Sequence, residues 1–184
     1  EVAAASASGI AQAFASAVPR EEIVRFDRLC RIIHVLNYFS QTGGNRGDLY
    51  LNVIGRHLLE VSEEHGKTFE SLLGFCGIKP TRIVLEILES DVDNLDKLQA
   101  AVQSYRRRGF RVAIDYFGAQ NSNFDRLWRL TPDIVKIDRS LIVQATCNTR
   151  ALRLLPKLTE IIHDLGATVV CEGIETHVQH ALAV

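Results

Sequence analysis

Short apolar runs alternate with longer segments of helical periodicity along this chain. Valine, isoleucine and leucine concentrate in five short runs, at residues 49–54, 83–87, 112–114, 134–137 and 168–171. In the longer segments, apolar residues recur three or four positions apart, which places them on one face of a helix. These segments lie at residues 23–36, 93–108 and 152–165. The order of strand and helix predicts an α/β protein whose parallel strands are joined by crossover helices.

Two architectures fit this order, an open doubly wound sheet and a (β/α) barrel. The predicted strands are apolar nearly throughout, as expected for strands that are buried on both faces. No G-x-G-x-x-G turn follows the first strand, which weakens the dinucleotide-binding form of the doubly wound sheet. The five strands are also fewer than the eight of a closed barrel, which typically needs about 250 residues. The pattern alone therefore leaves both architectures open.

Composition narrows the class of protein. The 184 residues include 21 Lys+Arg and 22 Asp+Glu, a formal charge of −1, and this balance argues against a nucleic-acid binder that relies on clustered positive charge. No run approaches the ~20 apolar residues of a membrane-spanning helix. The cysteines form no CxxC pair, which favours reduced, mostly buried thiols in the cytoplasm over a disulfide framework or a zinc site. They are Cys30, Cys76, Cys147 and Cys171.

Every predicted strand ends in a polar side chain or is followed by one. These residues are Asn52, Glu86, Asp115, Lys136 with Asp138, and Glu172 with Glu175. In parallel α/β folds, ligands bind at the carboxyl ends of the strands, so we expect these side chains to share one rim of the sheet. A polar residue at one strand end is common, but its recurrence at every strand indicates a site.

The chemistry of this set favours a hard cation. Converging carboxylates repel one another unless a cation or a shared proton compensates. The set offers oxygen donors and contains no His or Cys, which suits Mg²⁺ or Mn²⁺ better than zinc. With Lys136 as a further positive charge, the set points to phosphoryl chemistry. The alternative is that some members are helix caps or salt bridges: Ser90 and Asp91 suit caps, and Glu175 either caps a helix or orients Lys136.

Four segments resemble successive motifs of EAL domains in their order and spacing. They are residues 85–90 (Leu-Glu-Ile-Leu-Glu-Ser), 115–120 (Asp-Tyr-Phe-Gly-Ala-Gln), 136–140 (Lys-Ile-Asp-Arg-Ser) and 172–176 (Glu-Gly-Ile-Glu-Thr). The resemblance extends from about Ala13 to the end of the chain and includes Leu51-Asn52-Val53. It implies a modified TIM-like (β/α) barrel whose rim binds cyclic di-GMP. Active members of the family hydrolyse this dinucleotide to pGpG with Mg²⁺ or Mn²⁺.

The resemblance also implies a role for each strand-end residue. The implied metal ligands are Asn52, Glu86, Asp115 and, near a second metal, Asp138. The implied catalytic residues are Glu172 as general base, Lys136 on the attacking water and Glu175 as support for Lys136. Gln179 matches a glutamine with a local structural role.

Several departures from the family pattern bear on activity. Tyr116 stands where the family has the second of two consecutive aspartates, and a tyrosine is a poor ligand for Mg²⁺. Residues 118–121 read Gly-Ala-Gln-Asn, where active members have a Gly-Thr-Gly-Tyr-like loop. Neither the Glu-Ala-Leu strand of the family nor its last strand is recognisable in the chain. We therefore expect the second metal to be poorly held.

We expect two parts in the chain. Residues 1–19 are an Ala/Ser-rich lead-in, in which Glu1-Val2-Ala3 is a candidate remnant of the first barrel strand and its loop. Residues 20–184 are an EAL-like barrel domain that lacks the last strand, so the barrel is expected to be incomplete at both ends.

Three hypotheses for the function remain. The leading one is a degenerate EAL domain that binds cyclic di-GMP with weak or no hydrolysis. The second is an active Mg²⁺- or Mn²⁺-dependent cyclic di-GMP phosphodiesterase. The third is a protein-interaction module that no longer binds nucleotides. The resemblance further implies a homodimer and an attached sensory or GGDEF domain as partners.

Overall fold

The computed structural model of the protein describes residues 20–42, 47–53, 66–88, 94–119 and 124–183. Within these residues, five parallel strands form one sheet. The strands are β1 (Leu49–Val53), β2 (Ile83–Leu88), β3 (Arg111–Phe117), β4 (Ile134–Ile137) and β5 (Thr168–Cys171). All five predicted strands are confirmed, and β3 is longer than its apolar run because it continues through Asp115 and Tyr116.

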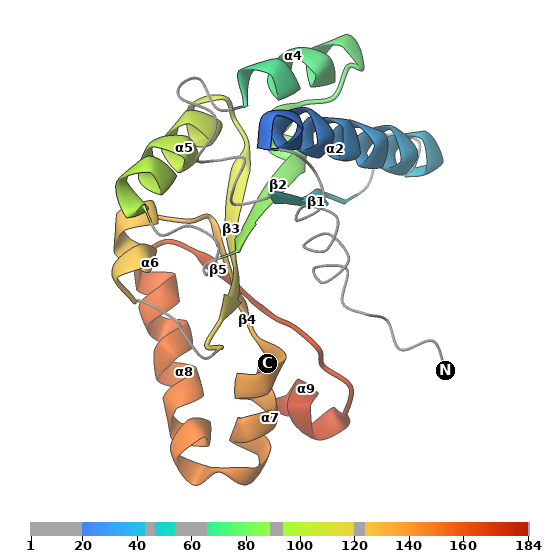
Figure 1. The fold of residues 1–184 in the computed structure, drawn as a ribbon. Coiled ribbons are helices and arrows are strands. Elements are labelled where there is room, and N and C mark those ends of the chain that lie inside the picture. Colours follow the sequence, from blue (N-terminus) through green and yellow to red (C-terminus); the bar gives the residue numbers. More distant parts are fainter. Residues whose placement is uncertain (1–19, 43–46, 54–65, 89–93, 120–123, 184) are drawn as a thin grey trace.

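Helices precede, connect and follow the strands (Figure 1). They are α2 (Arg20–Thr42), α4 (Lys67–Phe75), the 3₁₀ turn η1 (Pro80–Arg82), α5 (Leu95–Arg107), α6 (Phe124–Leu130), α7 (Arg139–Cys147), α8 (Thr149–Asp164) and α9 (His177–Ala183). The three predicted helices correspond to α2, α5 and α8. The other helices have at most nine residues, which is too short for a clear helical periodicity.

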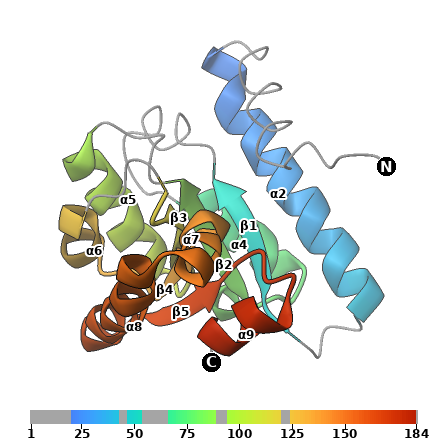
Figure 2. The same cartoon turned by 90° about the horizontal axis from the view of Figure 1, so that it is seen from below.

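The strand order decides between the two architectures. The sheet follows the chain in the order β1-β2-β3-β4-β5, whereas a doubly wound sheet reverses its order at a switch point. Right-handed crossovers in one direction place the connecting helices on the same face of the sheet, as in a barrel. Figures 1 and 2 show α5, α6 and α8 side by side along one side of the strands. The predicted lead-in at residues 1–19 lies outside the described residues.

The two faces of the sheet differ in character because side chains alternate along each strand. Ile83, Leu85 and Ile87 of β2 belong to the main core, together with apolar residues of α5 and α8. On the other face, Val84 packs with Ala113 and Ile134 in a small separate cluster. The helix-facing side of the sheet therefore supplies most of the core, and the inner face has room for polar groups nearer the carboxyl ends of the strands.

The helix α2 buries a different face from the one that its sequence predicts. Leu29, Ile33 and Leu36 share one side of the helix but are 56%, 46% and 47% exposed. The buried side carries Val35 of the core and also Asp27 and Arg31, whose side chains lie 2.5 Å apart (Oδ2 to Nη2). The Arg31 guanidinium also stacks over a phenylalanine ring of α4, with 5.1 Å between its Cζ atom and the ring centroid. The Leu29, Ile33 and Leu36 side of the helix therefore lies outside the core, and the buried side combines the apolar Val35 with an ion pair and a cation–π contact.

The thiols also differ from the expectation. All four cysteines are free, as predicted, but Cys76 and Cys147 are exposed and Cys30 and Cys171 are only half-buried. The prediction of mostly buried thiols is therefore wrong. Among the residues described, no helix combines the length and the apolar character needed to cross a membrane.

The contrast between the core and the surface can be tested with two leucines. Leu85 is fully buried in β2, whereas Leu152 is exposed on α8. We expect Leu85→Ala to lower the free energy of unfolding by about 2–5 kcal/mol, because it leaves a cavity in the core. The matched control Leu152→Ala should cost less than about 1 kcal/mol. Urea unfolding followed by circular dichroism measures both values, and equal losses would contradict this description of the core.

Candidate functional site

Four charged side chains, three from strands and one from the residue after a fourth strand, meet at the carboxyl ends of the sheet. The Lys136 Nζ atom lies 2.6 Å from Glu86 Oε1 and 2.6 Å from Glu172 Oε1. It also lies 3.2 Å from Asp115 Oδ1. Glu86, Asp115 and Lys136 belong to β2, β3 and β4, and Glu172 directly follows β5. We call these four residues the Lys136 cluster; the structure brings them together at one rim, as the strand ends predict.

The strand geometry explains this convergence. Glu86, Asp115 and Lys136 each stand two residues after a member of the small apolar cluster on the inner face, so their side chains point to that same face. All three are buried, whereas Glu172 is half-buried. The cluster therefore rests on an apolar layer and opens toward solvent on the side of Glu172.

Negative charge is in excess within the cluster, because three carboxylates face one ammonium group. Burial raises the pKa of Asp115; Lys136 lowers it, while the charges of Glu172 and Glu86 raise it further, and the net effect is a rise from 3.8 to about 6. Burial by itself would lower the pKa of Lys136, but hydrogen bonds to Glu172 and Glu86 and the charges of Asp115 and Glu86 outweigh it and raise that pKa. The ammonium therefore stays charged, but one positive charge does not neutralise three carboxylates, and a further cation would stabilise the site.

A β-bulge shapes the backbone next to Asp115. In the register of β3 with β4, Ile114 pairs with Val135 and Phe117 with Ile137, so β3 contains one extra residue in this interval. Tyr116 within it has a left-handed φ of 58°, and its N–H donates to Asp115 Oδ1 at 2.9 Å. The bulge therefore orients the Asp115 carboxylate and holds Tyr116 in a conformation that is uncommon for a non-glycine residue.

Asp138 stands at the start of α7 and caps that helix. Its carboxylate accepts a hydrogen bond from Ser140 N–H at 2.8 Å, and its own N–H donates to Phe117 O at 2.9 Å. Asp138 therefore lies beside the bulge of β3, at the same rim as the Lys136 cluster. A cap uses one carboxylate oxygen as an acceptor, and this leaves the second oxygen of Asp138 for another partner.

The segment after β5 places Glu175 against a partner that the sequence did not predict. Glu175 Oε2 lies 2.6 Å from Arg139 Nη2, and not against Lys136 as expected. Gly173, with a φ of +64°, lies so close to Arg139 that a Cβ atom there would stand 2.8 Å from the arginine side chain. Gln179 Oε1 accepts the N–H groups of Glu175 and Thr176 at 2.7 and 3.0 Å, which confirms its local structural role. Arg139 directly follows Lys136-Ile137-Asp138 in the sequence, and this position is the signal that could have identified it as a residue of the rim.

Asn52 occupies the neighbouring strand β1. It pairs in register with Glu86 of β2, and its side chain is exposed. Strand alternation directs it to the same face as Glu86. The structure therefore puts Asn52 beside the cluster, at its exposed edge. Glu89, Ser90 and Asp91 lie outside the described residues, as does the loop segment 120–123.

The donor chemistry of the cluster fits a hard divalent cation. Within the described ranges, no three Asp, Glu, His or Cys side chains stand together in a position to hold a metal ion, and the carboxylates that converge surround the Lys136 ammonium instead. Their oxygens are nevertheless the donors that Mg²⁺ and Mn²⁺ take, and the excess of negative charge favours such an ion. The residues present therefore suit the metal that the family resemblance implies.

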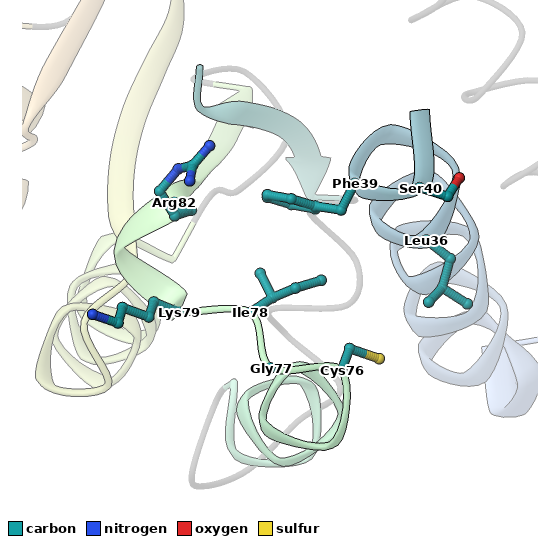
Figure 3. Close-up of a pocket in the computed structure, with 8 residues that line it drawn as sticks. All are labelled: Leu36, Phe39, Ser40, Cys76, Gly77, Ile78, Lys79 and Arg82. Carbon is teal, nitrogen blue, oxygen red and sulfur yellow. The ribbon is translucent and has the colours of Figure 1, made fainter. Parts of the chain in front are cut away.

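A separate cavity of about 670 Å³ lies near the opposite end of β2 (Figure 3). It is lined by Leu36, Phe39, Ser40, Cys76, Gly77, Ile78, Lys79 and Arg82. Arg82 stands just before β2, with its Cζ atom 5.5 Å from the centroid of the Phe39 ring, and its Nε atom donates to Gly47 O at 3.1 Å. Among the described residues that line this cavity there is no carboxylate, so the chemistry-bearing candidate site is the Lys136 cluster.

Comparison with known proteins gives a family and several similar chains. The family model described as "EAL domain" matches residues 6–183. A protein of Escherichia coli K12 named "Probable cyclic di-GMP phosphodiesterase PdeA" is 34% identical over 106 residues, which are 57% of this chain and 14% of that protein. The Bacillus subtilis "Uncharacterized EAL-domain containing protein YkuI" is 31% identical over 120 residues, 63% of this chain and 30% of that protein. The chain therefore spans only a minor part of these relatives.

Two solved structures resemble the fold closely. Klebsiella pneumoniae BlrP1, solved as a manganese and cyclic di-GMP complex, has a TM-score of 0.80 and 25% identity, and the alignment covers 91% of this chain and 42% of BlrP1. YkuI of Bacillus subtilis, solved with cyclic di-GMP and calcium, has a TM-score of 0.72 and 27% identity, covering 90% of this chain and 41% of YkuI.

The raised pKa of Asp115 predicts a specific pH dependence for the metal-free protein. Because the folded state binds this proton more tightly than the unfolded state, the contribution of Asp115 to stability is lost as the pH rises from about 4 to above about 6. An asparagine has no such proton. The free energy of unfolding of Asp115→Asn, relative to that of the parent protein, should therefore increase across this interval. Urea unfolding in a chelating buffer at several pH values measures the difference; a difference that stays constant or decreases would contradict the assignment.

Proposed function

The chain belongs to the EAL domain family, and from this premise we propose that it is a cyclic di-GMP signalling module that binds this dinucleotide at the rim of its barrel. The observation that carries the proposal is the Lys136 cluster, in which residues of the family-like motifs come together from three strands and from the end of a fourth. The complexes of BlrP1 and YkuI with cyclic di-GMP, at 25% and 27% identity, support the choice of ligand.

We assign the proposed metal to the oxygen donors of this rim. Asn52, Glu86 and Asp115 would hold Mg²⁺ or Mn²⁺, with Asp138 near a second ion. The manganese and calcium in the similar complexes support a divalent ion without selecting between metals. When bound, the metal supplies a Lewis acid that polarises the phosphodiester and neutralises its charge. This role suits a cluster that has more carboxylates than ammonium groups.

The chain's own residues would handle the proton and the water molecule. The half-buried Glu172 faces solvent at the edge of the cluster, which allows it to accept a proton from an attacking water molecule. Lys136 donates to Glu172 at 2.6 Å and so fixes the direction of that carboxylate. Glu175 would act indirectly, because it forms an ion pair with Arg139. The Arg139 side chain packs against Gly173, the residue after Glu172, so this pair would hold the segment that carries Glu172.

We propose that hydrolysis is weak because of Tyr116. The left-handed bulge presents a phenol where the family has a carboxylate, and a second metal would lose a strong ligand there. Cleavage with two metal ions depends on a clamp around both the attacking and the leaving oxygen. Binding and hydrolysis are separable, so the nucleotide can still bind when this clamp is weak.

A second candidate function, hydrolysis of cyclic di-GMP to pGpG, is favoured by one observation. The contact between Lys136 and Glu172 preserves the pair that would activate water. In this version Asp138 and water would hold the second metal. The third candidate, a protein-interaction module without nucleotide, does not account for a cluster of four charged groups of which three are buried.

The proposal also covers location and partners. The aligned segment is a minor part of its relatives, and we propose that the module works beside a sensory or GGDEF domain and pairs as a homodimer. Four free cysteines suit the reducing cytoplasm, where we place the protein.

The binding proposal can be tested by calorimetry. Cyclic di-GMP titrated into the protein with Mn²⁺ should give a measurable affinity, and Glu86→Gln should weaken it at least about 10-fold, as the loss of metal-site groups does elsewhere. Glu160→Gln on the exposed side of α8 is the matched control and should bind like the parent protein. No binding with or without metal would rule out the proposal in favour of the nucleotide-free module.

The weak-hydrolysis proposal depends on Tyr116. We expect Tyr116→Asp to raise the Mn²⁺-dependent formation of pGpG by roughly 100-fold, the effect of about 3 kcal/mol of transition-state stabilisation. Tyr116→Phe removes only the phenol oxygen and should produce no gain. Chromatographic detection of pGpG measures the rates. Rapid turnover by the parent protein, unchanged in Tyr116→Asp, would favour the active phosphodiesterase instead.

A further inference from the structure

We propose that Lys136 is a resident counter-ion, which occupies the carboxylates of the rim in the metal-free protein and competes with a divalent cation for them. This inference rests on the proposed metal ligands Glu86 and Asp115. It assigns to Lys136 a control over metal affinity, in addition to its proposed contact with water.

The geometry of the ammonium group carries the inference. A lysine ammonium has three N–H donors and no acceptor, and here three carboxylates lie within 3.2 Å of it. Glu86 and Asp115 come from different strands and Glu172 directly follows a third, and the Lys136 side chain is 11% exposed. The Lys136 ammonium is therefore surrounded by carboxylate oxygens, as a small metal cation would be. Its three N–H groups have three carboxylates to accept from them.

The carboxylate oxygens of Glu86 and Asp115 cannot bind both the Lys136 ammonium and a divalent metal ion without weakening one of the two interactions. A divalent ion on Glu86 and Asp115 would place two like charges close together in a buried region where screening by water is weak. Lys136 must then withdraw from these two carboxylates, or the metal binds less tightly. Metal binding therefore includes the displacement of an existing charge, which lowers the apparent affinity.

Glu172 can remain the ion-pair partner of the Lys136 ammonium after a metal has displaced it from the other two carboxylates. It is the partner of Lys136 that does not belong to the proposed metal set, and it lies 2.6 Å from Nζ at the more open side of the cluster. Metal binding would release Lys136 from Glu86 and Asp115 and leave it paired with Glu172. The exchange would thus leave the proposed water-activating pair assembled at the moment when the metal arrives.

A purely structural salt bridge leads to a different expectation. If Lys136 only stabilised the fold, its removal would lower the stability by the same amount with and without metal, and metal affinity would fall or stay constant. A resident counter-ion instead couples the two properties: its removal destabilises the metal-free state and strengthens metal binding. The sign of the change in affinity separates the two roles.

The test compares Lys136→Met with the parent protein and with Lys157→Met, a control at an exposed position on α8. Titration calorimetry with Mn²⁺ alone should show affinity at least about 10-fold tighter in Lys136→Met and unchanged in the control. Thermal unfolding in a chelating buffer should show a lower Tm for Lys136→Met, and Mn²⁺ should raise that Tm more than it raises the Tm of the parent protein. Lys136→Arg keeps the charge and should not gain affinity.

The following outcomes overturn the inference: equal or weaker Mn²⁺ binding in Lys136→Met, or no Mn²⁺ binding in any variant. Should Lys136→Met fail to fold, Lys136→Gln replaces it with the same expectations, because it removes the charge and keeps a polar head group. None of these measurements uses cyclic di-GMP. A protein that binds Mn²⁺ more tightly as Lys136→Met but never binds the nucleotide would therefore refute the proposed function and leave this inference standing.

Discussion

A single buried ammonium group organises the rim of this barrel. Three carboxylates are brought together by strands that are parallel and in sequence order, and their mutual repulsion would oppose that arrangement if no cation compensated. Lys136 supplies the compensation from the strand between Asp115 and Glu172. Because the partners come from two strands and from the end of a third, the electrostatics of the site and the alignment of the strand ends depend on one another.

The strands of this fold can be predicted from the sequence, because a strand that is buried on both faces consists almost entirely of apolar residues and forms a short apolar run. The helix α2 shows the limit of such reasoning. Several of its regularly spaced apolar residues are exposed, whereas the buried side carries Val35 together with Asp27 and Arg31, which form an ion pair while the guanidinium lies over an aromatic ring. A partner from α4 decides this orientation, and periodicity within one helix contains no information about that partner.

The candidate site was also predictable in part, because its composition follows from the order of the strands. The carboxyl ends of parallel strands share one rim, so the gathering of Glu86, Asp115 and Glu172 follows from topology. The position of Lys136 at the centre of these carboxylates does not, because it depends on the register between strands. The pairing of Glu175 with Arg139 was likewise missed, since it depends on a turn whose path the sequence motif does not specify.

That turn limits which residue can stand at position 173. Gly173 has space for a hydrogen atom only, because the aliphatic stem of Arg139 fills the volume that any larger residue would need. Its left-handed backbone adds a second reason for glycine at this position. The requirement is steric and involves neither a metal nor a nucleotide: a side chain at this position would displace the Arg139 that pairs with Glu175. Gly173 therefore serves the shape of the rim, by leaving room for the arginine that holds Glu175 in place.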